Sequence, residues 1–177
     1  MSLIPEFELG LWNAWILMFI QVIINHFLLM QISKGYLKKR VAETPGTVPL
    51  NKTEKKIDIF STIFLFLLFI YSVVLPLQLG TVWFYTGLAI FLLGLILGLI
   101  VSIPWVTTPL DEPLTKGLYR YSKHPIYLTI FLRFIGVGIA SASWLFLLFL
   151  IVHIILTNFL VIAEERFLLK MHACTSS

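Results

Sequence analysis

The chain has 177 residues, of which 59% are apolar and 12% are charged, and its mean hydropathy is +0.95. A soluble domain of this length cannot hide so much apolar surface, so the composition excludes one and indicates an integral membrane protein. The net charge of +4 comes from basic residues in short loops, which membrane topology explains without a nucleic-acid partner. Cys174 is the single cysteine, which excludes a disulfide framework and a cysteine-built metal site.

Five apolar segments approach the length needed to cross a bilayer, whose core of about 30 Å requires roughly 20 helical residues. The predicted spans cover about residues 9–32, 59–79, 82–103, 126–141 and 144–163. No basic region precedes the first span, so we expect it to be retained rather than cleaved as a signal peptide. The second and third spans turn at Gln78 to Gly80, and the last two turn near Ser141 to Ser143. The sequence therefore predicts an all-α integral membrane protein with one membrane domain, residues 1–177.

The basic residues predict the orientation of these spans. They gather in the loop after the first span, in the loop before the fourth and after the fifth: Lys34, Lys38, Lys39, Arg40, Lys52, Lys55, Lys56, Lys116, Arg120, Lys123, Arg166 and Lys170. Five spans bring these regions to one face, which the positive-inside rule assigns to the cytoplasm. We therefore expect the N-terminus outside and the C-terminus in the cytoplasm. On the cytoplasmic side, Asn51 and Glu54 have the spacing of a capping box that opens the second span.

The last two spans bring opposite charges to one cytoplasmic rim. Counting outward from a turn near residue 142 places Glu164 and Glu165 opposite the segment from Arg120 to His124. Snorkelling or headgroup contact accounts for single basic residues such as Lys123 at a span end. Two adjacent carboxylates gain nothing from the anionic leaflet, which repels them, so they require a cationic partner or a ligand. Such a rim suits a zwitterionic ligand that meets a lipid-dissolved partner.

Polar residues also occur inside the last two spans. The same counting places Tyr127 near Asn158 and Arg133 near His153, as a ladder that descends from the rim. Arg133 lies about two turns into the membrane, so it must pair, snorkel or line a polar cavity. His153 is more simply explained as a hydrogen-bonding group between helices than as a ligand.

Two motifs at this rim resemble a known family. The string LTKGLYRYSKHPIYLT contains a Gly-x-Tyr and a His-Pro-x-Tyr element, and EERFLL follows it about 40 residues later. Over its last third the chain resembles the membrane methyltransferases related to isoprenylcysteine carboxyl methyltransferase and the phospholipid methyltransferases. The matching residues are Gly117, Tyr119, His124, Pro125, Tyr127, Glu164, Glu165 and Leu168.

The resemblance implies that S-adenosyl-L-methionine binds at the cytoplasmic end of the last helical hairpin. The implied cofactor-binding residues are Tyr119, Arg120, His124, Pro125, Tyr127, Glu164 and Glu165. Carboxylates accept hydrogen bonds from ribose or amine groups, and His124, Tyr127 and Arg120 donate to the cofactor's carboxylate. The implied partners are membrane lipids and a lipophilic methyl acceptor, which is a prenylated molecule, a phospholipid or a small thiol or carboxylate. Arg133 is the candidate catalytic residue.

The sequence departs from the family pattern in three places. Lys123 replaces an arginine, and Thr129 stands where the family often has glycine, which adds bulk where the chain passes close to the cofactor or a helix. The last residues read KMHACTSS, whereas relatives continue with a Phe-Gly-x-x-Tyr-x-x-Tyr segment that helps close the site. We therefore expect another lid, a weaker catalyst or a variant end.

Two other functions fit parts of the sequence. A membrane protein that keeps the family fold without catalysis fits the different C-terminal segment. A membrane sterol-type reductase shares a related Pro-Asn-Tyr motif, but Ile126 stands where that asparagine belongs, which argues against a nicotinamide cofactor.

Overall fold

The computed structural model describes residues 10–32, 51–107, 120 and 125–175. Over these residues the chain forms five α-helices, and its β-structure is limited to isolated bridges such as the one between Asn13 and Pro76. The helices are α1 (Trp15–Ile32), α3 (Lys52–Val74), α4 (Val82–Thr107), α5 (Pro125–Ala140) and α6 (Trp144–Thr175). The prediction of an all-α protein is confirmed, and a helix lies at each of the five predicted spans.

Counting only described residues, three helices are long and apolar enough to cross a membrane, over Lys52–Val74, Val82–Pro104 and Trp144–Ala163. Helix α5 is a shorter apolar helix of 16 residues. A 16-residue helix is about 24 Å long, less than the bilayer core. These helices support membrane association, whereas the sidedness of the chain stays a prediction.

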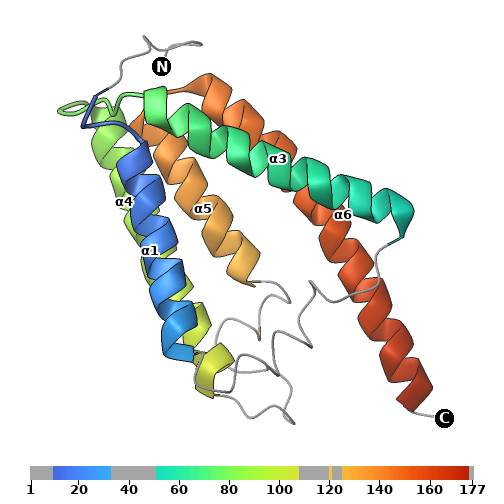
Figure 1. Ribbon diagram of the computed structural model, residues 1–177. Coiled ribbons are helices and arrows are strands. Elements are labelled where there is room, and N and C mark those ends of the chain that lie inside the picture. The colour runs from blue at the N-terminus through green and yellow to red at the C-terminus, as the bar shows by residue number, and fades with distance from the viewer. Residues whose placement is uncertain (1–9, 33–50, 108–119, 121–124, 176–177) are drawn as a thin grey trace.

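The two tight turns and the start of α1 meet at one end of the molecule, which we call the turn end (Figure 1). Backbone hydrogen bonds fix this meeting: the Ala14 N–H donates to Leu75 O over 2.8 Å, and the Gln78 N–H donates to Ala140 O over 3.1 Å. The opposite end, where α3 and α5 begin and α4 ends, we call the loop end. The turns require unusual backbone angles, with φ of 77° at Gly80 and 50° at Ala142.

The second predicted span is too long at its turn end. We expected it to reach residue 79, but α3 ends at Val74. Leu75 precedes Pro76 and has an extended backbone with φ −98° and ψ 106°, because the proline ring excludes helical geometry from the residue before it. Leu77 and Leu79 follow the proline, so hydropathy alone does not reveal the end of the helix.

The helices pack mainly as two pairs, α4 with α5 and α3 with α6, and α1 contacts α3, α4 and α5 (Figure 1). The two helices of the α5–α6 hairpin consequently have different main neighbours and diverge from their turn toward the loop end. The fully buried core includes Leu75, Ala140 and Phe146, close to the turn end.

Small residues allow α4 and α5 to approach closely. A Cβ added at Gly87 would clash with the backbone of Ala140, and one added at Gly136 would lie 2.6 Å from the backbone N of Phe91. Such contacts leave no room for a side chain. Close backbone approach at small residues is a usual way for helices to associate in a membrane, where the hydrophobic effect between helices is weak.

Candidate functional site

The predicted cofactor-binding residues lie partly within the described chain. Pro125 is buried and is the first residue of α5, and Arg120 is exposed. Glu164 and Glu165 belong to the helix α6, which continues without a break to Thr175. Tyr119 and His124 lie outside the described residues, so the predicted juxtaposition of the two motifs stays a prediction.

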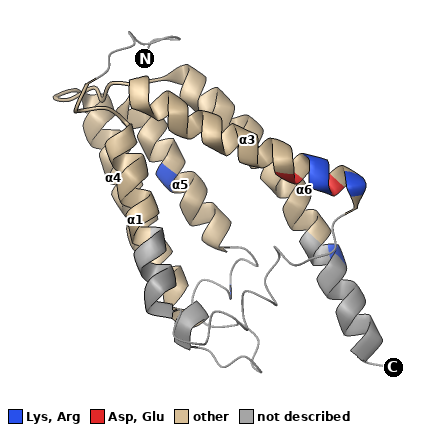
Figure 2. Cartoon of the chain, in the orientation of Figure 1, with Lys and Arg blue, Asp and Glu red and all other residues tan. Residues whose placement is uncertain are grey.

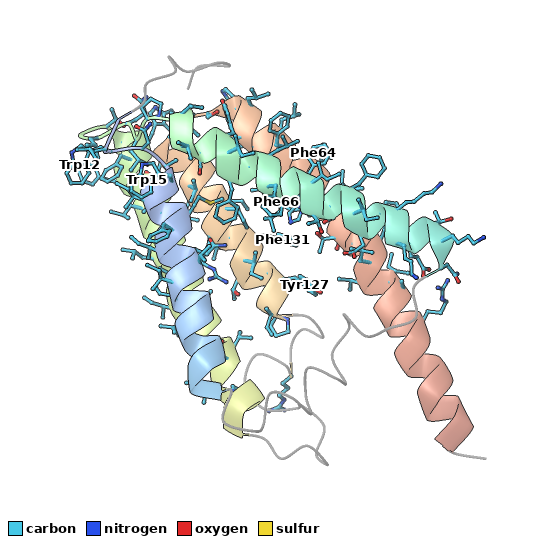
Figure 3. All side chains as sticks on the ribbon, viewed as in Figure 1. Trp12, Trp15, Phe64, Phe66, Tyr127 and Phe131 are labelled. Atoms are coloured by element: carbon cyan, nitrogen blue, oxygen red, sulfur yellow. The ribbon has the colours of Figure 1, made fainter. Side chains whose placement is uncertain are left out.

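Aromatic rings lead from the loop end of α5 toward α6. Tyr127 stacks on Phe131, with ring centroids 6.5 Å apart and an interplanar angle of 26° (Figure 3). Phe131 in turn meets the ring of His153 edge-on, at 6.4 Å and 85°, and Phe134 contacts the same ring at 6.4 Å. These contacts confirm that the residues around position 133 and His153 lie at similar depth, as counting from the turn predicted.

A buried polar network joins α3 to α6. The Ser61 hydroxyl lies 3.2 Å from His153 Nδ1 and 3.5 Å from Thr157 Oγ1, and the Thr157 hydroxyl donates to the backbone O of His153 over 2.9 Å. All three side chains are buried. The prediction that His153 is an interhelical hydrogen-bonding group is confirmed. Ser61 and Thr157 could not be singled out from the sequence, because single hydroxyl residues in apolar helices have no distinctive spacing.

Arg133 is buried between α5 and α4, with 4% of its surface exposed. Its Nε donates to Thr129 O over 3.2 Å, and its guanidinium passes along Gly98, where an added Cβ would lie 3.7 Å from Nη2. The prediction placed Arg133 near His153. The depth is right, but the side chain follows the glycines of α4, whereas the adjacent Phe134 contacts His153.

Thr129 explains how this chain tolerates one departure from the family pattern. It is buried, and its hydroxyl donates to the backbone O of Ile126 over 2.8 Å, so its polar atom is satisfied within α5. A Cβ at Gly98 would lie 3.5 Å from Thr129 Oγ1, which is ordinary van der Waals contact. The extra bulk of Thr129 is therefore accommodated against α4 at a glycine.

Charged residues gather where the start of α3 lies beside α6 (Figure 2). The predicted capping box is confirmed, since a Glu54 carboxylate oxygen accepts from the Asn51 backbone N–H over 2.7 Å. The other oxygen of this carboxylate accepts a hydrogen bond from Arg166 on α6, 112 residues away, in an ion pair. The capping spacing is visible in the sequence, but the pairing with Arg166 is not.

Within the described ranges, no three His, Cys, Asp or Glu side chains are grouped so that they hold a metal ion. The described side chains include the buried guanidinium of Arg133, the Glu54–Arg166 ion pair and an aromatic face on α5.

The C-terminal part of the chain is similar to a known protein family. The family model described as phospholipid methyltransferase matches residues 107–174, which include both motifs, all of α5 and nearly all of α6. The resemblance predicted from the two motifs is thereby confirmed for this part of the chain. Neither a curated protein nor a solved structure gives a significant match. Together, the family match and the apolar helices support a membrane methyltransferase that acts on lipid.

Proposed function

We propose that this protein transfers the methyl group of S-adenosyl-L-methionine to a lipophilic acceptor held in the membrane. The observation that carries the proposal is the family match over residues 107–174, because the matched segment contains both motifs at their expected spacing. The long apolar helices support an acceptor that reaches the site from the lipid.

The proposed cofactor site lies at the loop end, between the segment that leads into α5 and the Glu164–Glu165 pair of α6. Its members are Tyr119, Arg120, His124, Pro125, Tyr127, Glu164 and Glu165. The donor set fits the cofactor, because carboxylates complement its ammonium and ribose hydroxyls and a guanidinium complements its carboxylate. The buried Pro125 fixes where α5 begins, and this places Tyr127 in its first turn. We place this end in the cytoplasm, in agreement with the predicted topology.

When bound, S-adenosyl-L-methionine supplies an electrophilic methyl group next to a sulfonium. The work left to the protein is positioning and the exclusion of water, since transfer from a sulfonium to an anion disperses charge. The stacked rings of Tyr127 and Phe131 form an apolar wall suited to excluding water. Arg133 is the proposed catalytic residue, because a buried cation attracts and orients an anionic acceptor. A carboxylate or thiolate acceptor requires no general base, whereas an amine must first lose a proton.

The direct test is binding of S-adenosyl-L-methionine to the full chain in nanodiscs, measured by calorimetry. The double variant Glu164→Gln, Glu165→Gln keeps the shape of both side chains and removes their charge. We expect it to bind at least about tenfold more weakly, since a hydrogen bond to a charged group contributes roughly 1.5–3 kcal/mol. Asp58→Asn is the matched control, because Asp58 is an exposed carboxylate on α3, and this variant should bind like the wild type.

The outcomes separate the parts of the proposal. A wild type that does not bind the cofactor refutes the proposed function. Equal binding by the wild type and the double variant removes only the role of the two glutamates. A second assay follows transfer of a labelled methyl group to prenylcysteine, phospholipid and thiol acceptors. Cofactor binding without transfer to any of them contradicts the enzymatic part and leaves a binding protein with the family fold.

A further inference from the structure

Glu54 makes one contact within the start of its own helix and one with α6, 112 residues away. One carboxylate oxygen accepts from the Asn51 N–H at the start of α3, and the other accepts from the Arg166 guanidinium of α6. The Glu54 side chain is 14% exposed and the Arg166 side chain 53%. Since the cap already orients the carboxylate, Arg166 meets an acceptor that is held in place.

Arg166 directly follows Glu164 and Glu165 on the same uninterrupted helix. The three residues lie within about 3 Å along the helix axis, because each residue rises about 1.5 Å. A tether on Arg166 therefore restrains the backbone of the glutamate pair. This restraint matters because α6 has α3 as its main neighbour and diverges from α5 toward the loop end.

We propose that Glu54 is a positioning residue for the cofactor site: through Arg166, it holds the Glu164–Glu165 segment of α6 at a fixed place beside the start of α3. The inference rests on the proposed function, because the Glu54–Arg166 contact can affect cofactor binding only if Glu164 and Glu165 bind the cofactor. Glu54 itself is assigned no contact with the cofactor. The capped start of α3 then serves as the fixed point from which α6 presents its carboxylates.

The ion pair can be separated from the cap with three variants. Glu54→Gln removes the charge, yet glutamine at this position still completes a capping box. Asn51→Ala weakens the cap and leaves both charges in place. Arg166→Met removes the other partner and keeps an apolar stem of similar length. The readout is the Kd of S-adenosyl-L-methionine for the full chain in nanodiscs, with the unfolding temperature of each variant measured alongside.

We expect Glu54→Gln and Arg166→Met each to bind the cofactor about two- to fivefold more weakly, the size expected for a partly exposed ion pair. The double variant should lose no more than either single one, since both remove the same contact. Arg166→Lys should regain part of the affinity, because it restores the charge. Asn51→Ala should lower the unfolding temperature and leave the Kd unchanged, because the backbone N–H of residue 51 that orients Glu54 is retained. Lys55→Met controls for the loss of a nearby exposed cation.

The salt dependence of the cofactor's Kd is a further measurement, and a purely structural role of Glu54 would not change it. Added salt should weaken cofactor binding more in the wild type than in Glu54→Gln, because the variant has no charge pair left to screen. If the wild type binds and Glu54→Gln binds equally well, the positioning role is refuted and the proposed function stands. An equal loss in Lys55→Met also refutes it, since the effect is then one of general surface charge. A wild type that does not bind refutes the proposed function and this inference with it.

Discussion

The two helix pairs of this protein are held together by different means. Between α4 and α5 the backbones touch at glycines, with Gly87 against Ala140 and Gly136 against Phe91. Between α3 and α6 the contacts are made by side chains, with the Ser61–His153 hydrogen bond within the apolar part and the Glu54–Arg166 ion pair at the loop end. The first interface depends on close backbone packing, whereas the second combines polar side-chain contacts with aromatic ones such as Phe64 against Phe149.

This difference shows how the two helices of the α5–α6 hairpin can pack against two different helices, α4 and α3. Helix α5 is packed on α4 through contacts that do not tolerate added atoms, so it forms the rigid side of the α5–α6 hairpin. Helix α6 is joined to α3 by hydrogen bonds of modest strength, which in membrane proteins contribute about 0.6 kcal/mol on average. Pro125 and Tyr127 of the first motif lie on α5, and the second motif lies on α6, the two helices that diverge from the shared turn (Figure 1). Substitutions that change volume on one side and polarity on the other should therefore have different consequences.

The largest effect is expected for Gly87→Leu. A Cβ at this position meets the backbone of Ala140, which cannot move without displacing α5, so we expect a loss of at least about 3 kcal/mol of folding free energy. Thermal unfolding in detergent, followed by size-exclusion chromatography, measures this loss. Ala89→Leu adds the same side chain on the exposed side of α4 and should change little. Equal stability of Gly87→Leu and Ala89→Leu would contradict the close backbone contact.

The second prediction concerns Arg133, which lies at the glycine-lined interface and is charged. Arg133→Met keeps an unbranched stem of similar length but removes the charged donor of the hydrogen bond to Thr129 O, so we expect a loss of about 1.5–3 kcal/mol of stability. If Arg133 orients an anionic acceptor, methyl transfer should fall at least about tenfold, which corresponds to about 1.4 kcal/mol of barrier. Unfolding temperature and kcat/KM are measured on the same samples. A stable variant with full activity would remove Arg133 from the mechanism.

The third prediction tests the polar side of the comparison. Ser61→Ala removes the hydroxyl that faces His153 and should cost about 0.5–2 kcal/mol, because a buried polar atom loses its partner. A double-mutant cycle with His153→Phe, which keeps an aromatic ring against Phe131, should give a coupling of about 0.6–1.7 kcal/mol. Ser102→Ala is the matched control, since the Ser102 hydroxyl bonds to Gly98 O within α4. A coupling near zero would show that the hydrogen bond does not hold α3 to α6.

Hydropathy and turn residues were sufficient to predict the helices of this fold. A helix lies at each predicted span, and the turns at Gln78 to Gly80 and at Ser141 to Ser143 are where the sequence placed them. The error at the end of α3 arose because Pro76 stops the helix inside an apolar run, where composition does not change. The pairing of the helices could not be predicted. Each helix is apolar on several sides, so the spacing of apolar residues does not show which side packs against another helix.

The candidate site was predictable in part. Counting from the turn gave the right depth for His153, because both helices rise equally per residue. It could not show which way Arg133 points, since that depends on the glycines of α4, a helix outside the hairpin. The Glu54–Arg166 pair was also beyond prediction, because its partners are 112 residues apart and each has a sufficient local explanation, as a cap and as an interfacial cation.

The smallest effect is expected for Gly98→Ala, and it defines how far the close contact of α4 and α5 extends. An added Cβ at Gly98 meets Thr129 Oγ1 at 3.5 Å, an ordinary contact, whereas one at Gly94 meets the Arg133 backbone N at 3.0 Å. Alanine also favours a helix by about 1 kcal/mol over glycine, so Gly98→Ala should be neutral or slightly stabilising. Gly94→Ala is the comparison and should destabilise, because Arg133 must shift to make room. If both variants unfold at the same temperature, the close contact ends before Gly94, and the position of Arg133 is then not set by α4.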